Sequence, residues 1–224
     1  MRHAFGNTNI PLKGFLKLTR QAESTGERPV IVAITGASGA LYALGLLSQL
    51  CGKEIPVDLI VSEMGRDMLR RETGIPAKGS LREHLAEREI VADNLRIHEV
   101  DDLAAAPASG SYQARAMVIC PCSVKTLSAV AAGACRTLVE RAAEVTLKER
   151  RKLLLVLRES PYSLTQIENM RAVTLAGAIV LPASPAFYHH PKNISDLVDF
   201  LVARILDQLD IPHTLFRPWG REES

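Results

Sequence analysis

Short apolar runs, each followed by a stretch with helical periodicity, constrain the fold of this 224-residue chain more than any other feature. The run Val30–Thr35 is rich in β-branched residues and ends at a glycine, which is typical of a buried strand. From Ser38 onward, leucines recur at a spacing of three residues, as expected for a helix. This alternation predicts a three-layer α/β fold, in which helices cover both faces of a doubly wound, mostly parallel sheet.

The same pattern predicts the remaining elements and a single domain over residues 30–224. Further strands are expected at Pro56–Val61, Leu95–Val100, Met117–Cys120 (stopped by Pro121), Leu153–Leu157 and Gly177–Leu181. Helices are expected at Leu81–Ile90, Ser123–Ala132, Thr137–Lys152, Ile167–Ala176 and Ile194–Leu209. Residues 1–29 lack periodicity and are basic at first, which favours a poorly ordered or peripheral extension over a targeting presequence.

Composition narrows the class of protein. Hydrophobic residues make up 47% of the chain and charged residues 23%, which argues against disorder as its main state. The formal net charge of +2 gives no reason to expect a nucleic-acid or membrane surface, and no apolar run is long enough for a transmembrane helix. The four cysteines do not match the spacing of a zinc site. We therefore expect buried thiols, no metal, and a reducing, cytoplasmic location.

Ligands in this architecture bind outside the carboxyl ends of the strands, so the segments that follow the strands form the candidate site. The first, Thr35–Ala40, reads TGASGA, and its small residues let backbone N–H groups approach an anion at a helix start. Its spacing matches neither a dinucleotide fingerprint nor a Walker A loop, so a single phosphate, as in FMN, fits better than a pyrophosphate. An ordinary tight turn is an equally good interpretation of this motif alone.

Three further strand-end segments carry polar or aromatic groups, and each also has a structural interpretation. Hydroxyls in Pro121–Thr126 meet another helix start, where Ser123 also suits an ordinary N-cap. The pair Arg158–Glu159 follows an apolar strand, where charges are either paired at the rim or functional. The loop 182–191 combines three prolines with an aromatic pair and two histidines, which suits a preformed apolar pocket better than a metal site.

Arg204 lies on the last expected helix, at the border of its apolar stripe, whereas Asp196 and Asp207 are predicted on the opposite face. Its side chain could extend to solvent with a packed stem, or grip a phosphate through both arms of the guanidinium. The crowded charges around Lys148 are typical of a solvated helix surface. The small-residue loop 107–111 could close over a flat ring or serve as a flexible connector.

Taken in order, these segments resemble the flavin prenyltransferase family, UbiX, over roughly Val30 to Trp219. The matching segments are TGASGA at 35–40, Ser62, ASGS at 108–111, CSVKTLSA at 122–129, ERAAEVTLKERR at 140–151, RESP at 158–161, IENM at 167–170, LPASPAFYHHP at 181–191 and DLVDFLVARILDQL at 196–209. The combination is far more specific than any single segment. Two departures are Ser62-Glu63-Met64, where relatives often carry a lysine, and His190, where an arginine is common.

The resemblance implies a flavodoxin-like (Rossmann-like) fold that binds reduced FMN as a substrate. It implies transfer of a dimethylallyl group from dimethylallyl phosphate to N5 and C6 of the flavin. The product, prenylated FMN, would serve UbiD-type decarboxylases in ubiquinone biosynthesis or aromatic acid decarboxylation. The implied reaction needs no metal, and the implied assembly is a homo-oligomer, a dodecamer with sites at subunit interfaces.

The resemblance also assigns site residues, position by position. Those matching flavin-binding positions are Gly36, Ala37, Ser38, Ser62, Ser123, Val124, Lys125, Thr126 and Arg158. Those matching positions around the prenyl phosphate, in part supplied across an interface, are Arg141, Lys148, Tyr188 and Arg204. Ser38, Glu72 and Glu159 match polar groups implicated in catalysis, and Glu159 is our candidate for moving the proton lost from C6.

Two other functions fit parts of the pattern. A flavin-dependent cysteine decarboxylase of the same fold would need a histidine in the helix after the first loop, and Leu41–Leu50 contains none. A non-enzymatic FMN-binding electron carrier would tend to be acidic, whereas the pI of this chain is about 8.4. A prenyltransferase is therefore the predicted function, with these two as alternatives.

Overall fold

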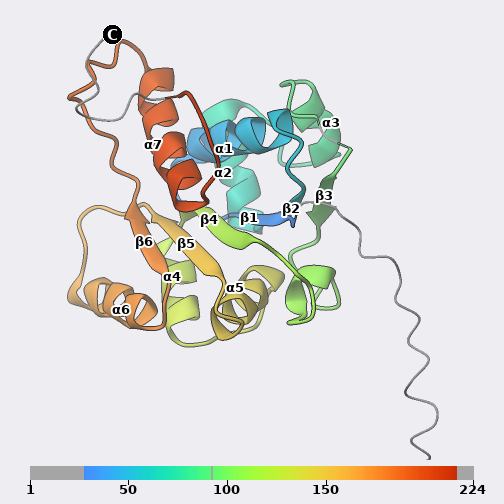
Figure 1. Ribbon diagram of the computed structural model, residues 1–224, viewed down its shortest axis with the longest axis vertical. Coiled ribbons are helices and arrows are strands. Elements are labelled where there is room, and N and C mark those ends of the chain that lie inside the picture. The colour runs from blue at the N-terminus through green and yellow to red at the C-terminus, as the bar shows by residue number, and fades with distance from the viewer. Residues whose placement is uncertain (1–27, 92, 216–224) are drawn as a thin grey trace, which may run out of the picture.

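Six strands lie side by side in the order β3-β2-β1-β4-β5-β6, and every neighbouring pair is parallel. They are β1 (Val30–Ile34), β2 (Val57–Val61), β3 (Leu95–His98), β4 (Ala116–Cys122), β5 (Lys152–Leu157) and β6 (Ile179–Pro182). The computed structural model describes residues 28–91 and 93–215 (Figure 1). Residues 1–27 of the predicted extension, and Trp219 at the end of the resemblance, lie outside this part. The predicted α/β fold is confirmed, with the strand order of Rossmann-type sheets.

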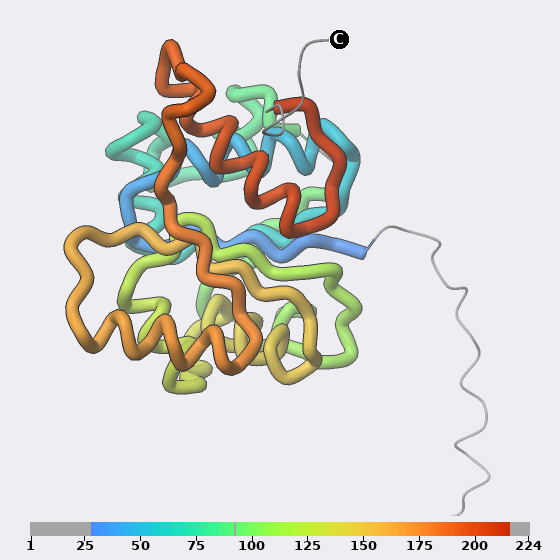
Figure 2. Tube along the Cα trace, turned by 60° about the vertical axis from the view of Figure 1, so that its left-hand side comes forward, coloured from blue at the N-terminus to red at the C-terminus, as the bar shows by residue number. Residues whose placement is uncertain are grey.

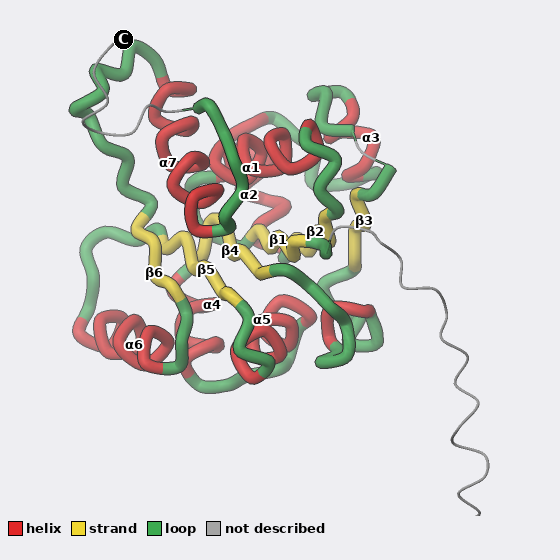
Figure 3. The backbone as a smooth tube through the Cα atoms, viewed as in Figure 1, coloured by secondary structure: helices red, strands yellow, loops and turns green. Residues whose placement is uncertain are grey.

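Seven α-helices in the described part of the chain cover the two faces of the sheet, as Figures 2 and 3 show. One face carries α1 (Ala40–Gly52), α2 (Glu63–Thr73), α3 (Leu81–Ala86) and α7 (Ile194–Gln208). The other carries α4 (Val124–Ala131), α5 (Leu138–Lys148), α6 (Leu164–Leu175) and a short 3-10 helix, η2 (Ala106–Ala108). None of the helices in residues 28–91 and 93–215 combines the length and apolarity that crossing a bilayer requires.

The strand order reverses between β1 and β4, which is where ligands bind in sheets of this kind. Val32 of β1 lies opposite Leu59 of β2 on one side and Val118 of β4 on the other. The chain then leaves β1 toward α1 on one face and leaves β4 toward α4 on the other face. The two connections therefore diverge and open a crevice at the carboxyl edge of the sheet.

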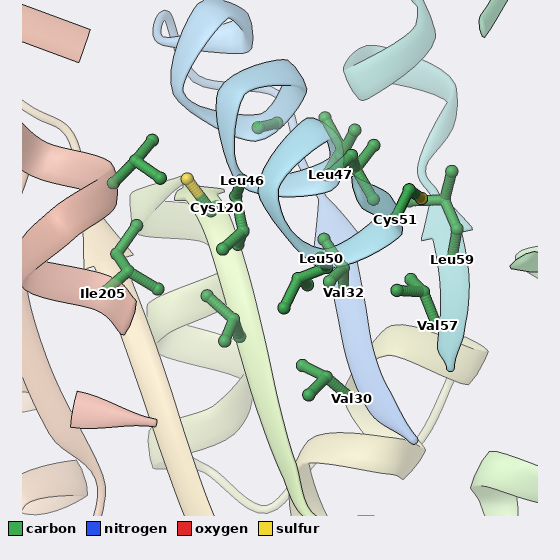
Figure 4. Close-up of a cluster of buried hydrophobic side chains, with 14 of the residues drawn as sticks. Val30, Val32, Leu46, Leu47, Leu50, Cys51, Val57, Leu59, Cys120 and Ile205 are labelled. Atoms are coloured by element: carbon green, nitrogen blue, oxygen red, sulfur yellow. The ribbon is translucent and has the colours of Figure 1, made fainter. Parts of the chain in front are cut away.

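Apolar packing under α1 and α7 fixes the position of the first helix (Figure 4). Val30 and Val32 of β1, Leu46 and Leu50 of α1, and Ile205 of α7 are fully buried in one cluster. Burial of a side chain of this size stabilises a fold by about 1.5–3 kcal/mol. This packing holds the start of α1 at the crevice.

Pro121 does not stop β4, contrary to the expectation from the sequence. The strand continues to Cys122, because the Pro121 carbonyl still accepts hydrogen bonds from Thr35. The Thr35 backbone N–H donates at 3.3 Å and its hydroxyl at 2.8 Å. A proline lacks only its own donor, so the end of a strand tolerates it. The pairing of β4 with β5 shifts register between Ile119 and Cys122.

Three helices differ from their predicted ranges by three residues or more at one end. The helix expected to reach Lys152 is α5, which ends at Lys148, because Arg150 adopts a left-handed conformation with a φ of 56°. Helix α6 begins earlier than expected, at Leu164, since Ser163 and Gln166 form a capping box before it. Helix α3 ends at Ala86 and stops short of the predicted end.

The cysteines are free thiols, and the expected burial is confirmed for three of them: Cys51, Cys120 and Cys122. Cys135 is only partly buried. Burial raises the pKa of Cys122 to about 12, although the Leu127 backbone N–H lowers it somewhat. A thiol with so high a pKa is a poor nucleophile, so Cys122 serves as a small apolar core residue.

Candidate functional site

Four helices begin around one cavity at the carboxyl edge of the sheet. Helices α1, α2 and α4 follow β1, β2 and β4, and the switch point lies between β1 and β4. The cavity has a volume of about 620 Å³ and is lined by residues from these strand ends, by the start of α5, by Val100, and by Arg158 and Glu159 after β5. Helix N-termini carry partial positive charge, so the cavity suits an anionic group.

The loop after β1 is compact because two of its glycines leave no room for a side chain. A Cβ at Gly36 would lie 2.5 Å from the Cβ of Met64. Gly39 has a φ of 122°, which L-residues rarely adopt. The Thr35 hydroxyl accepts the Ser123 backbone N–H at 2.9 Å, which ties this loop to the start of α4. Three residues predicted from the sequence line the cavity from this loop: Gly36, Ala37 and Ser38.

The N-terminus of α1 is capped by a side chain from another helix. Its N-cap, Gly39, has no side chain, and the Glu72 carboxylate of α2 accepts the N–H groups of Gly39 at 2.9 Å and Ala40 at 2.7 Å. Burial would raise the pKa of Glu72, but hydrogen bonds from Ser38 and these two amides, with the charge of Arg158, outweigh it and lower the pKa. Glu72 is therefore an anion that holds the loop from beside the cavity.

Ser62 and Ser123 each cap the helix that follows them. The Ser62 hydroxyl accepts the Gly65 N–H at 3.1 Å, and the Ser123 hydroxyl accepts the Thr126 N–H at 3.3 Å. The side-chain oxygens of Ser123 and Thr126 lie 3.0 Å apart and share a hydrogen bond. The structural interpretation of Ser123 as an N-cap is confirmed. The same segments also line the cavity, through Ser62, Ser123, Val124, Lys125 and Thr126.

Arg158 and Glu159 join the lining from the end of β5. Arg158 is exposed and Glu159 is half-buried, with the Glu159 carboxylate accepting the Ser160 N–H at 2.9 Å. The ion pair between Arg158 and Glu159, which the sequence left open, does not form among the described residues. Both side chains therefore retain groups that can face a ligand.

Glu140 is a lining residue that the sequence analysis missed. It is 7% exposed at the start of α5, where its carboxylate accepts the Arg136 backbone N–H at 2.8 Å. Burial would raise the pKa of Glu140, but hydrogen bonds from Arg136 and the charge of Lys125 outweigh it and lower the pKa. The available signal was the threonine at 137, three residues before it, a spacing typical of helix starts.

This set of groups fits a ligand with a phosphate and a flat ring. The first turn of α4 offers two hydroxyls and Lys125 and contains no acidic residue, whereas the first amides of α1 are taken by Glu72. A phosphate therefore fits the start of α4 better than Gly39 and Ala40. Apolar surface for a ring comes from Met64, Met68 and Val100, and a cavity of this volume is ordinary for a cofactor.

Arg141 and Lys148 lie on α5, outside the lining of this cavity. Arg141 donates through Nε to the Ala108 carbonyl at 3.1 Å and pairs with Glu144 at 2.9 Å. Lys148 pairs with the adjacent Glu149. Because a Cβ at Gly110 would lie 2.9 Å from Lys148 Nζ, both cations border the loop 107–111.

Tyr188 and Arg204 lie near and on α7, also outside the cavity lining. Tyr188 packs edge-on against Phe200, with ring centroids 5.9 Å apart. Arg204 pairs with Asp207 at 2.6 Å, so the expectation that Asp207 points to the opposite face is wrong. Residues three positions apart share a helix face, which outweighs the assignment by apolar stripe. One subunit thus gathers the residues predicted to bind flavin and leaves those predicted around the prenyl phosphate apart.

Comparison with known proteins gives a consistent result. A family model described as Flavoprotein matches residues 18–206, and thus begins within the predicted extension. Flavin prenyltransferase UbiX from Pseudomonas aeruginosa is 47% identical over 202 residues, which cover 88% of this chain and 97% of that protein.

Solved structures agree with the sequence comparison. AnUbiX, crystallised in complex with FMN and dimethylallyl pyrophosphate, superposes with a TM-score of 0.80 at 38% identity, covering 88% of this chain and all of that one. A dodecameric FMN-dependent UbiX-like decarboxylase from Escherichia coli O157:H7 gives 0.78 at 39% identity, covering 86% of this chain and all of that one.

These similarities confirm the predicted family, the flavodoxin-like fold and an enzyme that handles FMN. They favour the prenyltransferase over both alternatives, the cysteine decarboxylase and the electron carrier. The chain belongs to the UbiX family of flavin prenyltransferases.

Proposed function

We propose that this chain joins the dimethylallyl group of dimethylallyl phosphate to N5 and C6 of reduced FMN. The C–O bond of the donor breaks and inorganic phosphate leaves as a C–N bond forms at N5. A C–C bond then forms at C6 as the allylic double bond is consumed. The two protons lost from N5 and C6 are balanced by one taken up by the departing phosphate and one taken up by the inner carbon of the former double bond. The observation that carries this proposal is the convergence of the α4 N-terminus, Arg158 and Glu159 on one cavity with apolar walls. Bound FMN supplies the nucleophilic ring atoms, so the protein's task is positioning and charge stabilisation.

The flavin half of the proposed site lies within one chain. We place the FMN phosphate at the start of α4, where Ser123, Lys125 and Thr126 offer hydroxyls and a cation. The ring then extends across Gly36–Ser38, where the absence of large side chains permits close approach. Arg158 faces the ring from the end of β5. Ser62 and Val124 contribute further contacts to the flavin, and Ala37 lies beneath it.

The prenyl-phosphate half draws on a second copy of the chain. Arg141 and Lys148 supply cations for the leaving phosphate, joined by Tyr188 and Arg204. These residues lie outside the cavity of one subunit, and the similar E. coli protein is a dodecamer. We therefore propose a homo-oligomer, specifically a dodecamer, in which neighbouring copies complete each site. Fixed cations stabilise the departing phosphate without reorganising at the moment of reaction.

Glu159 has the proposed role of moving the proton lost from C6. It is half-buried and lines the cavity, and within residues 28–91 and 93–215 its Oε1 accepts one hydrogen bond, from the Ser160 N–H. Ser38 and Glu72 act together beside it: Glu72 is held as an anion, and its hydrogen bond from Ser38 sets the direction of that hydroxyl. Proton transfer by a positioned carboxylate contributes about 10²–10⁴-fold to a rate.

The product, prenylated FMN, would pass to a UbiD-type decarboxylase. We place this protein in the cytoplasm, because three of its thiols are buried and free and a reducing compartment keeps such thiols unpaired.

The direct test is incubation of the purified protein with reduced FMN and dimethylallyl phosphate under anaerobic conditions, with dimethylallyl pyrophosphate as a second donor. Mass spectrometry should show FMN enlarged by one dimethylallyl group. Unmodified FMN, recovered from folded and flavin-bound protein with either donor, would overturn the proposal.

A matched pair of variants tests the role of Glu159. Glu159→Gln should retain FMN and lose at least tenfold in turnover, whereas Glu87→Gln, at an exposed position just after α3, should leave turnover unchanged. Full activity of Glu159→Gln would remove its proposed role while leaving the overall reaction intact.

A further inference from the structure

Helix α6 exposes large apolar side chains on the side that faces away from the sheet. Leu164 and Leu175 expose 73% and 74% of their surface, and Ile167 exposes 47%. On the inner side, Val173 is buried, but Asn169 spends its side chain on a hydrogen bond to Ser128 at 2.8 Å. A helix that serves only its own subunit turns its apolar face inward. In α6 only Val173 and Met170 face the core, whereas the apolar residues Leu164, Ile167 and Leu175 face outward, which indicates a partner for the outer face.

The outer face has a regular sequence. Leu164, Glu168, Arg171 and Leu175 follow one another at intervals of four, three and four residues, which places them in one stripe along the helix. Glu168 and Arg171 form an exposed ion pair at 3.9 Å in the middle of this stripe. Scattered exposed leucines are normal on a surface, whereas here Leu164 and Leu175 lie on one side of one helix, at either end of an exposed ion pair.

The stripe is self-complementary. Leu164 lies as far before its midpoint as Leu175 lies beyond it, and Glu168 and Arg171 are related in the same way. Two copies of α6 placed antiparallel about a twofold axis therefore bring each Leu164 against the partner's Leu175, and each Glu168 against the partner's Arg171. A twofold interface requires this reciprocity, because residue i contacts j and j contacts i.

We infer that the outer face of α6 is a self-association surface, on which two copies of this chain pack their α6 helices antiparallel about a twofold axis. The inference rests on the proposed homo-oligomer and specifies one of its contacts. The leucines supply the buried apolar area at both ends, and the ion pairs across the axis set direction and register. A parallel pairing would oppose like charges and is disfavoured by the same residues.

The first test removes the apolar ends. In Leu164→Asp/Leu175→Asp, particle mass measured by light scattering after size exclusion should fall to a smaller defined species, with an unchanged circular dichroism spectrum. Val91→Asp is the matched control, since Val91 is 63% exposed and lies away from α6. Retention of the wild-type mass in the double variant, or an equal loss of mass in Val91→Asp, would overturn the inference.

The second test uses the charges. Glu168→Arg places like charges across the proposed axis and should weaken self-association on the order of tenfold, measured as the dissociation constant by analytical ultracentrifugation. Glu168→Arg/Arg171→Glu restores opposite charges across the axis and should recover assembly. Failure of the exchange to recover it would rule out antiparallel pairing.

The outcomes separate this inference from the proposed reaction. A wild-type protein that stays monomeric at all concentrations would overturn the α6 contact, and prenyl transfer is assayed independently of it. A stable oligomer unaffected by changes on α6 would assign its outer face to a different macromolecule and reject self-association there.

Discussion

Two loops rich in small residues, Gly36–Ala40 and Pro107–Ser111, are held by side chains of opposite charge. In the first, the Glu72 carboxylate accepts the backbone N–H groups at the start of α1. In the second, Arg141 donates to the Ala108 carbonyl, and Arg151 donates to the Gly110 carbonyl at 2.8 Å. The first loop is therefore anchored through its amides, and the second through its carbonyls.

The difference extends to the charge that each loop presents. Beside the first loop stands a carboxylate with a lowered pKa, which discourages a phosphate at Gly39 and Ala40. Beside the second stand Arg141, Arg151 and Lys148, of which Arg141 and Lys148 pair with glutamates, so cations outnumber carboxylates there and favour a phosphate. Loops of nearly the same composition are thus suited to different parts of the proposed reactants: a flavin ring at the first, a leaving phosphate at the second.

A buried carboxylate secures the far end of the second loop. Asp58 of β2 is fully buried and accepts hydrogen bonds from Arg96 at 2.8 Å and from Tyr112, which follows the loop. His98 Nε2 lies 2.7 Å from the same carboxylate. Burial would raise the pKa of Asp58, but these partners outweigh it and lower the pKa. A carboxylate thus also stabilises the second loop, indirectly, through Tyr112.

Of the changes that test this comparison, removal of the Asp58 charge should have the largest effect on stability. Asp58→Asn leaves Arg96 without its buried counter-charge, and we expect a loss of about 3 kcal/mol in the free energy of unfolding, measured by urea denaturation. The control is Asp67→Asn on α2, whose ion pairs with Arg70 and Arg71 are at the surface, and which should unfold almost as the wild type does. Equal losses in the two variants would contradict a buried anchor.

Removal of Glu72 should act on the first loop and on the flavin. Glu72→Ala leaves two amides of α1 without their acceptor, so we expect FMN affinity to fall about tenfold to a hundredfold, measured by fluorescence titration. Glu72→Gln keeps an acceptor oxygen and should lose less. Glu87→Ala, exposed beyond α3, is the control. An unchanged FMN affinity in Glu72→Ala would show that the loop Gly36–Ala40 keeps its conformation without the Glu72 carboxylate.

Tyr112→Phe is a smaller perturbation of the second loop. It removes the hydroxyl that donates to Asp58 and keeps the ring, so we expect a loss of about 1 kcal/mol in stability. If the loop faces the leaving phosphate, the KM for dimethylallyl phosphate should rise while the dissociation constant for FMN stays the same. A change in FMN affinity alone would assign this loop to the flavin half of the site.

The sheet and the residues after its strands could be predicted because they are local properties of the sequence. The β-branched residues of Val30–Thr35 predict a strand, and Ser123 predicts a helix start because serine is a favoured N-cap residue. Since parallel strands all end at one edge, the lining residues directly after β1, β2, β4 and β5 follow from the order of elements, whereas Glu140 on α5 does not.

The anchors of the loops could not be predicted, because they come from distant residues. Glu72 reaches Ala40 across 32 positions, and Arg151 reaches Gly110 across 41. No periodicity links such pairs, and only the packed fold brings them together. The prediction that Arg204 and Asp207 lie on opposite faces of α7 was wrong for a different reason. It was read from the apolar stripe, whereas the spacing of three residues places both side chains on the same face.

The smallest effect expected is a change in acid stability that separates the two loops. Glu72 has a lowered pKa in the folded chain, so the stability it contributes is present above the ordinary glutamate pKa of about 4.3 and is lost as the pH falls through the lowered value. Asp58 contributes in the same direction from its lower ordinary value. Urea denaturation of FMN-free protein between pH 5 and 3, a window that follows from those ordinary values, should show a shallower decline in Glu72→Gln than in the wild type.

In Asp58→Asn the same series should keep the part of the decline that Glu72 causes, at lower stability throughout. The Glu72 contribution is the smaller of the two because its carboxylate is only half-buried and solvent screens it. An unchanged slope in Glu72→Gln would mean that the amides of α1 bind the carboxyl group equally well in its neutral form, and the first loop would then differ from the second in geometry but not in charge.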